Sequence, residues 1–201
     1  MKGSLIIVGF FVLGTICGVC HLLPFDIAET NISYYALLCA LMFSVGLSVG
    51  NDPQTLKNFR SLNPRLIFLP IMTILGTLAG SAAVSLILTH RSLTDCLAVG
   101  SGFGYYSLSS IFITEYKGAE LGTIALLANI SREILTLLAA PLLVRWFGNL
   151  APISAGGATT MDTTLPIITR TAGQQFVVVS IFHGFVVDFS VPFLVTLFCS
   201  I

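Results

Sequence analysis

Residues 128–143 read ANISREILTLLAAPLL and lie within an otherwise apolar run that extends to Trp146. The run is long enough to cross a bilayer as a helix, since about 20 apolar residues span the hydrocarbon core. Asn129, Arg132 and Glu133 lie near its centre. Ionisable groups at that depth are costly and usually belong to a functional site. The stretch therefore predicts a membrane protein with a charged site inside the membrane.

The composition agrees with a membrane protein. The chain has 201 residues, of which 55% are hydrophobic and 9% are charged, and its mean hydropathy is +0.96. A soluble domain usually carries about 25% charged residues. The formal net charge is zero, which gives no indication of a nucleic-acid partner. We expect one transmembrane domain over residues 1–201.

Five stretches are apolar and long enough to be membrane helices. No long run alternates in polarity, so we expect an all-α polytopic protein rather than a β-barrel. The first stretch reaches about 20 residues and is interpreted as a retained helix rather than a cleaved signal peptide. The five stretches are 4–23, 34–50, 66–89, 121–147 and 174–199.

Two further stretches, 96–113 and 150–169, are apolar but interrupted. Such segments are tolerated at membrane depth where protein or water surrounds them, and pairs of them indicate the binding site of a secondary transporter. We therefore predict about seven membrane segments, two of them broken helices, in a core over residues 96–173. Whether the broken segments cross fully or re-enter stays open. The predicted hinge residues are Gly100, Gly102 and Gly104 in the first segment, and Gly156, Gly157 and Pro166 in the second.

Loop charges predict the orientation, because cytoplasmic loops are rich in lysine and arginine. Loop 51–65 carries Lys57, Arg60 and Arg65, whereas loop 24–33 carries two acidic residues. We expect the N-terminus to be cytoplasmic. With seven full crossings the C-terminus lies outside.

The charged residues suggest a cation site. On a helix, Asn129, Glu133 and Thr136 share one face with Ala140. Glu133 and Asp162 together outweigh Arg132 in charge, so their site would attract a cation and release it when a carboxylate is protonated. The alternative is a structural ion pair of Arg132 with one of the two carboxylates.

Several neighbours are weaker candidates for the same site. Tyr105, Tyr106 and Ser107 follow the first break, and a tyrosine face can hold an ammonium group; hydroxyls that only bond helix backbone are an equal alternative. Thr160 and Thr163 flank Asp162. Asp188 is either a cavity residue or a partner of His183 or of an arginine.

Residues 17–21, CGVCH, match the attachment pattern of c-type haem. The pattern closes an apolar helix here, so we interpret it as a helix end and expect no cofactor and no metal.

The chain resembles the lysine exporter family of bacteria, formerly a domain of unknown function. The resemblance covers nearly the whole chain and is most specific over 101–188. It rests on SGFGYYSLSSIFITE (101–115), ANISREILTLLAAPLL (128–143), GGATTMDTTLPIITRTAG (156–173) and HGFVV (183–187). It implies proton-driven export of L-lysine and toxic lysine analogues across the inner membrane. It also implies a fold related to antiporters with crossed, broken helices.

The resemblance implies roles for two residues. The family's intramembrane acids match Glu133 in SREIL and Asp162 in TTMDTTLP. No acidic residue of the family corresponds to Asp188.

The resemblance is to the C-terminal two-thirds of single-chain members, which carry about three more helices before this region. We expect a split transporter, completed by a small separate membrane subunit. A homo-oligomer stays open.

Three alternatives compete with lysine export. The first is a sodium or other cation/proton antiporter of the same fold, and the second is a non-transporting membrane subunit. The third, an aspartyl protease dyad, is disfavoured because the chain lacks a glycine-x-glycine-aspartate sequence. We therefore expect no enzyme.

Overall fold

The computed structural model describes residues 43, 64–88 and 90–201. The chain divides into two units, Met1–Leu56 and Lys57–Ile201, and the second contains nearly all described residues. The predicted spans 4–23 and 34–50, the CGVCH pattern and nearly all of loop 51–65 lie outside the described residues. The described residues form helices and contain no strand, which confirms the all-α prediction for this part of the chain.

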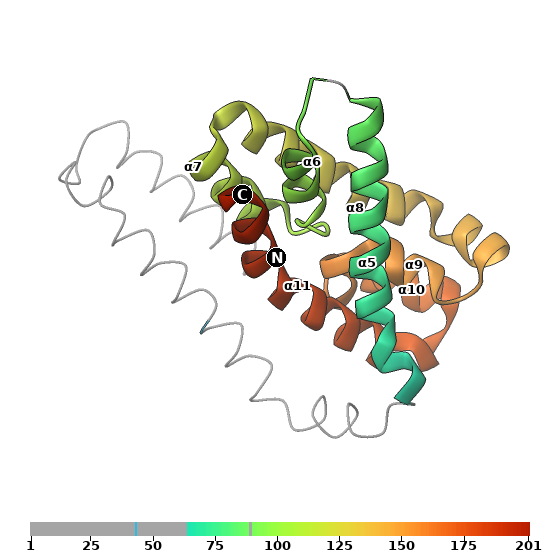
Figure 1. Ribbon diagram of the computed structural model, residues 1–201. Helices are drawn as coiled ribbons and strands as arrows, with labels where there is room; N and C mark the ends of the chain where they lie inside the picture. Colours follow the sequence, from blue (N-terminus) through green and yellow to red (C-terminus); the bar gives the residue numbers. More distant parts are fainter. Residues whose placement is uncertain (1–42, 44–63, 89) are drawn as a thin grey trace, which may run out of the picture. The chain divides into compact units, whose positions relative to one another are not determined.

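Three long helices form the frame of the second unit (Figure 1): α5 (Pro64–Ile87), α8 (Ala119–Phe147) and α11 (Val177–Ser200). Leu66–Ile87, Ala119–Phe147 and Gln174–Ser200 are each long and apolar enough to cross a membrane. They correspond to the predicted spans 66–89, 121–147 and 174–199. Each helix contains one proline in its interior, which leaves the carbonyl four residues earlier without its helical donor. These prolines are Pro70, Pro141 and Pro192.

The other elements are short and lie where the sequence predicted interruptions. Glycine is the worst helix former after proline, and threonine is also a weak one, so the helices end within these stretches. The elements are α6 (Leu93–Gly100), α7 (Tyr106–Lys117), α9 (Ala151–Gly156), the 3₁₀ helix η1 (Gly157–Met161), α10 (Leu165–Ala172) and the 3₁₀ helix η2 (Gln174–Phe176).

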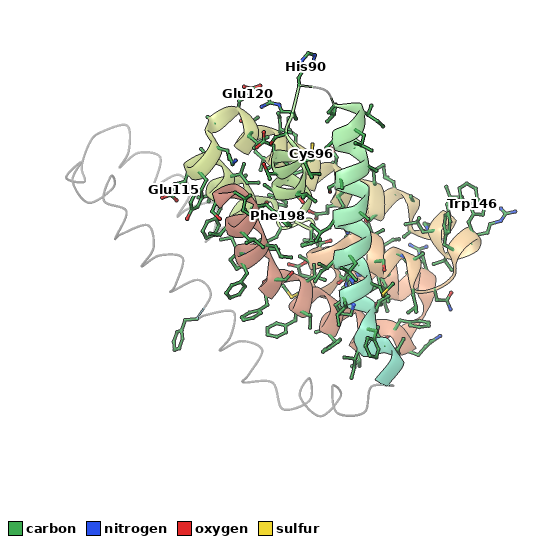
Figure 2. The ribbon with its side chains drawn as sticks, viewed as in Figure 1. His90, Cys96, Glu115, Glu120, Trp146 and Phe198 are labelled. Carbon is green, nitrogen blue, oxygen red and sulfur yellow. The ribbon has the colours of Figure 1, made fainter. Side chains whose placement is uncertain are left out.

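Helices α6 and α7 form the first hairpin. Ser92 caps α6 by accepting a hydrogen bond of 3.0 Å from the Asp95 amide. The Asp95 carboxylate, in the first turn of α6, lies 3.7 Å from the Lys117 ammonium in the last turn of α7. Arg91 also pairs with Glu120, and Figure 2 shows His90 and Glu120 at the same edge of the molecule. Both outer ends of this hairpin therefore lie together, and its tip is residues 101–105.

Helices α9 and α10, with η1 between them, form the second hairpin. Ile153 of α9 packs in one buried cluster with Ile168 and Ala172 of α10. Leu66 of α5 and Phe176 join this cluster, and Figure 1 shows α9 and α10 beside the same part of α5. The outer ends of the second hairpin thus lie near the start of α5, opposite the outer ends of the first, and its tip is residues 157–164.

Each broken segment therefore turns back instead of running from one end of the unit to the other. Of the two arrangements that the sequence left open, this geometry corresponds to re-entrant segments. The crossed, broken helices implied by the resemblance would instead have each segment continue past the break.

Candidate functional site

The tips of the two hairpins meet. The Phe103 carbonyl accepts a hydrogen bond of 2.9 Å from the Ala158 amide. Gly157 has a φ of 64°, and a Cβ there would lie 2.1 Å from the Phe103 oxygen. Gly104 has a φ of 95°, and a Cβ on it would lie 3.1 Å from the Gly156 oxygen. Three of the predicted hinge glycines are therefore the points of contact between the hairpins.

The remaining predicted hinge residues lie at close packing contacts or at the start of a helix. A Cβ on Gly100 would lie 1.9 Å from the Ser81 hydroxyl, and one on Gly102 would lie 2.4 Å from the Asn129 amide nitrogen. These glycines let the first hairpin approach α5 and α8. Pro166 lies in the first turn of α10, where a proline costs no hydrogen bond. Motion at any of these residues stays a prediction.

Asn129 anchors the first hairpin to α8. Its side-chain oxygen accepts a hydrogen bond of 2.7 Å from the Gly104 amide, and its nitrogen donates to the carbonyls of Val99 (3.3 Å) and Ala125 (2.9 Å). The side chain is buried. Backbone groups thus occupy most of its hydrogen-bonding capacity, and solute binding by Asn129 stays a prediction.

Arg132 anchors the second hairpin. Its Nε donates to the Ala155 carbonyl at 2.8 Å and its Nη2 to the Ser154 carbonyl at 3.0 Å. Its Nη1 lies 3.4 Å from the Thr77 hydroxyl of α5. The guanidinium also lies 5.9 Å from the centre of the Phe103 ring, within cation–π range.

The alternative of a structural ion pair through Arg132 is wrong for this structure. The ion pairs among the described residues are Arg91–Glu120 and Lys117–Asp95. Arg132 pairs with neither Glu133 nor Asp162, because its donors face carbonyls of α9.

Glu133 lies on α8 beside the predicted polar face. Asn129, Thr136 and Ala140 of that face are buried, and Glu133 is half-buried. Within the described residues, its carboxylate forms no hydrogen bond and no ion pair. A half-buried carboxylate without a protein partner remains available to a solute cation.

Asp162 ends η1 and is exposed. Its Oδ1 accepts hydrogen bonds from the Thr163 amide at 2.5 Å and the Thr163 hydroxyl at 3.4 Å. Thr163 and Asp162 were predicted to share one site. The contact between them joins two residues that are adjacent in the sequence. No hydrogen bond in the described part of the chain joins Asp162 to Glu133.

Asp188 lies on the part of α11 that contacts η1, the element that Asp162 follows. It is 4% exposed, on the buried face of α11. Gly184, one turn earlier, lies against Met161, because a Cβ there would be 2.7 Å from the Met161 amide nitrogen. Asp188 interacts electrostatically with Asp162, and Tyr105 interacts with both. The acidic character of Asp188 within an apolar span was the one signal in the sequence that could have placed it here.

His183 does not bond Asp188. Its Nδ1 shares a hydrogen bond of 3.2 Å with the Thr160 hydroxyl, and its Nε2 shares one of 2.9 Å with the Thr73 hydroxyl. Thr73 in turn bonds the Ser154 hydroxyl at 2.9 Å. Thr160, a predicted solute ligand, therefore belongs to a buried network that joins α5, α9, η1 and α11. Sequence reasoning missed this network because its partners are up to 110 residues apart.

Tyr105 precedes α7, whereas Tyr106 and Ser107 are exposed in its first turn. The structure thus brings Tyr105, but neither of its two neighbours, to the pair of aspartates. The predicted cavity roles of Tyr106 and Ser107 stay predictions.

Two hollows border Arg132. A hollow of about 450 Å³ lies among α5, α6 and α8, and its lining includes Thr77, Asp95, Asn129 and Arg132. A second, of about 430 Å³, lies along α8 and reaches Thr136 and Ala155. Glu133, Asp162 and Asp188 line neither of these hollows.

Comparison with known proteins places this chain in a family. The family described as "Lysine exporter LysO" matches residues 8–199. The chain belongs to the lysine exporter LysO family. This confirms the resemblance, and the family is one of exporters rather than enzymes.

Two relatives in the LysO family are similar over most of this chain. "Lysine exporter LysO" of Escherichia coli K12 is 35% identical over 197 residues, which cover 98% of this chain and 64% of that protein. "Putative lysine exporter" of Haemophilus influenzae is 35% identical over 170 residues, covering 85% of this chain and 86% of that protein. The chain thus spans less than two-thirds of the length of the E. coli relative. No solved structure matches the chain.

Proposed function

We propose that the chain exports L-lysine from the cytoplasm across the inner membrane in exchange for protons. Membership of the LysO family supports lysine as the substrate. The observation that carries the proposal is the placement of Arg132, which donates to backbone carbonyls. Glu133, Asp162 and Asp188 are left without a basic partner among the described side chains.

The unpaired carboxylates suit lysine because the free amino acid carries two ammonium groups and one carboxylate. An ammonium gains most from a carboxylate where water is scarce, since the Coulomb energy grows as the dielectric constant falls. We assign the ammonium groups to Glu133 and Asp162, with Tyr105 beside the latter. Arg132 borders both hollows and is the group that fits the lysine carboxylate.

The paired hairpins suggest how access alternates. They reach the middle of the molecule from opposite ends and touch through glycines and one backbone hydrogen bond. A displacement of one tip would therefore open the site towards one side of the membrane without moving the long helices. We propose this as the gating motion.

Charge on the described residues supports the proposed orientation. Arg145 and Arg170 lie near the end where α5 starts, together with Arg65 in the first turn of α5, whereas Arg91 and Lys117 lie near the opposite end beside Asp95, Glu115 and Glu120; Figure 2 shows Trp146 far from Glu115. The end where α5 starts therefore carries more arginine and lysine, and we propose that it is cytoplasmic. With both broken segments re-entrant, the predicted five full crossings still place the C-terminus outside.

Lysine efflux from cells that lack their own lysine exporter tests the proposal. Because the chain spans 64% of the E. coli relative, we would express it alone and together with the proposed small membrane subunit. Labelled lysine should leave the cells, and resistance to a toxic lysine analogue should rise. Unchanged efflux and sensitivity in both settings would contradict lysine export and favour a non-transporting subunit.

Glu133→Gln and Asp162→Asn should each reduce efflux to background, since each removes a negative charge from the site. Glu115→Gln, at the exposed end of α7, is the matched control and should export normally. All three proteins should accumulate to wild-type levels in the membrane. Retained analogue resistance in both site variants would refute the assigned roles.

A sodium/proton antiporter is the second candidate. Pro192 leaves the Asp188 carbonyl without its helical donor, so carboxylate and carbonyl oxygens occur together, and these are the ligands that hard cations prefer. Proton release from reconstituted protein separates the candidates. Release on adding sodium but not on adding lysine would favour the antiporter.

A further inference from the structure

We infer that Asp188 is the residue that carries the exchanged proton and loses it when lysine binds. The inference rests on the proposed function and extends it to a residue outside the pair of acids implied by the family resemblance.

The first support for this inference is that the carboxyl group of Asp188 is buried without a hydrogen-bond donor. Asp188 is 4% exposed, yet no side chain or amide in the described part of the chain donates a hydrogen bond to its carboxyl group. A buried ionised carboxylate without a partner is costly, so such a group takes up a proton or a cation.

The second support is the position of Asp162. Gly184 allows η1 to lie directly against α11, and Asp188 follows Gly184 by one turn on the same face. Asp162 follows η1 directly. The two carboxyl groups interact electrostatically across this contact. A negative charge near a buried carboxyl group disfavours its ionised form, so Asp188 is the group that holds the proton.

Among the described residues, no basic side chain pairs with either aspartate. The facing groups are the Tyr105 phenol, directly before α7, and on α11 itself His183, which is bonded to Thr160 and Thr73. Arg132 donates to α9. Lys117 pairs with Asp95 near Cys199, about 16 Å further along α11.

The difference in exposure assigns the two roles. Asp162 is exposed and is the carboxylate that a solute reaches first, whereas Asp188 is buried behind it. When a lysine ammonium binds at Asp162, the proton of Asp188 leaves to water. One positive charge enters and one leaves, so the charge of the site is unchanged and the exchange is balanced.

Asp188→Asn in proteoliposomes is the main test, because asparagine keeps the shape but cannot exchange a proton. We would measure two activities: exchange of labelled for unlabelled lysine, which needs no net proton movement, and lysine uptake driven by a pH gradient. Exchange should stay within about twofold of wild type, whereas gradient-driven uptake should fall at least tenfold. Ser190→Ala, in the same turn of α11, is the control and should retain both.

The outcomes separate this inference from the proposed function. If the wild-type protein neither exchanges nor accumulates lysine, the proposed function is contradicted. Gradient-driven uptake that survives in Asp188→Asn would overturn the inference alone. Equal loss of both activities in a folded variant would also overturn it, since Asp188 would then bind the solute itself.

A measurement on the wild-type chain covers the case in which the variant does not fold. Dicyclohexylcarbodiimide adds to protonated carboxyl groups in apolar surroundings. Mass spectrometry should find the adduct on Asp188 at pH 6 and much less of it at pH 9, with exposed Glu115 unmodified at both. Absence of an adduct on Asp188 at pH 6 would refute a proton there.

Discussion

Arg132 directs its three donor nitrogens to Ala155, Ser154 and Thr77, which belong to two other helices. Such a forked arrangement requires guanidinium geometry, which lysine lacks. The residue therefore fastens the second hairpin to α8 and forms no ion pair with Glu133 or Asp162. The charge of the proposed site depends on this choice of partners.

Arg132→Lys separates the contribution of the hydrogen bonds of Arg132 from the contribution of its positive charge. The change keeps the charge but loses at least one charge-assisted hydrogen bond, so the free energy of unfolding should fall by about 1.5–3 kcal/mol. Thermal unfolding in detergent measures this. Arg145→Lys, exposed in the last turn of α8, is the control and should change little. A stability equal to wild type would mean that only the charge at position 132 matters.

At the scale of elements, the two broken segments depend on glycine where they touch. Gly157 combines a left-handed backbone with a contact that excludes any Cβ, whereas Gly148 has a similar backbone, φ 87°, with open space around it. Substitution of these two glycines therefore separates the free-energy cost of a left-handed backbone from the free-energy cost of disturbing the contact between the hairpin tips. The hairpin tips can approach one another only while position 157 lacks a side chain.

Gly148→Ala should cost about 1–2 kcal/mol of stability, the price of the left-handed conformation. Gly157→Ala should cost about 1–3 kcal/mol more, because the new methyl group displaces the Phe103 carbonyl. Chemical unfolding of both variants gives the difference. Equal losses would show that the tips do not meet at this point.

At the scale of the whole molecule, the hairpins determine which loops share a side of the membrane. The ion pairs Arg91–Glu120 and Lys117–Asp95 hold the outer ends of the first hairpin together. The cluster around Ile153 and Ala172 does the same for the second hairpin at the opposite end. From these contacts we expect both segments to re-enter the membrane.

Cysteine labelling tests this topology in a chain whose five native cysteines are replaced by serine. Cysteines at His90 and Glu115, both exposed, should react with an impermeant maleimide from the outside. Cysteines at Asn149 and Gln175 should react only after permeabilisation. Reaction of positions 90 and 115 from opposite sides would mean that the first broken segment crosses the membrane.

The sequence predicted the elements well because their causes are local. Apolar length places α5, α8 and α11, and glycine, proline and threonine end the helices within 96–113 and 150–169. The same reasoning placed Glu133 and Asp162 inside the membrane region. It could not determine the partners of Arg132, since several acceptors were equally plausible from sequence spacing alone.

The sequence by itself determined the membrane class, the three spans, the positions of the breaks and, by resemblance, the family. Only the tertiary structure decided that the hairpins turn back and meet, that His183 bonds Thr73, and that Asp188 is buried on the face of α11 that contacts η1. The physical reason is the separation along the sequence between the residues that interact. Helix formation depends on neighbouring residues, whereas the charge of a buried site depends on side chains that distant helices bring together.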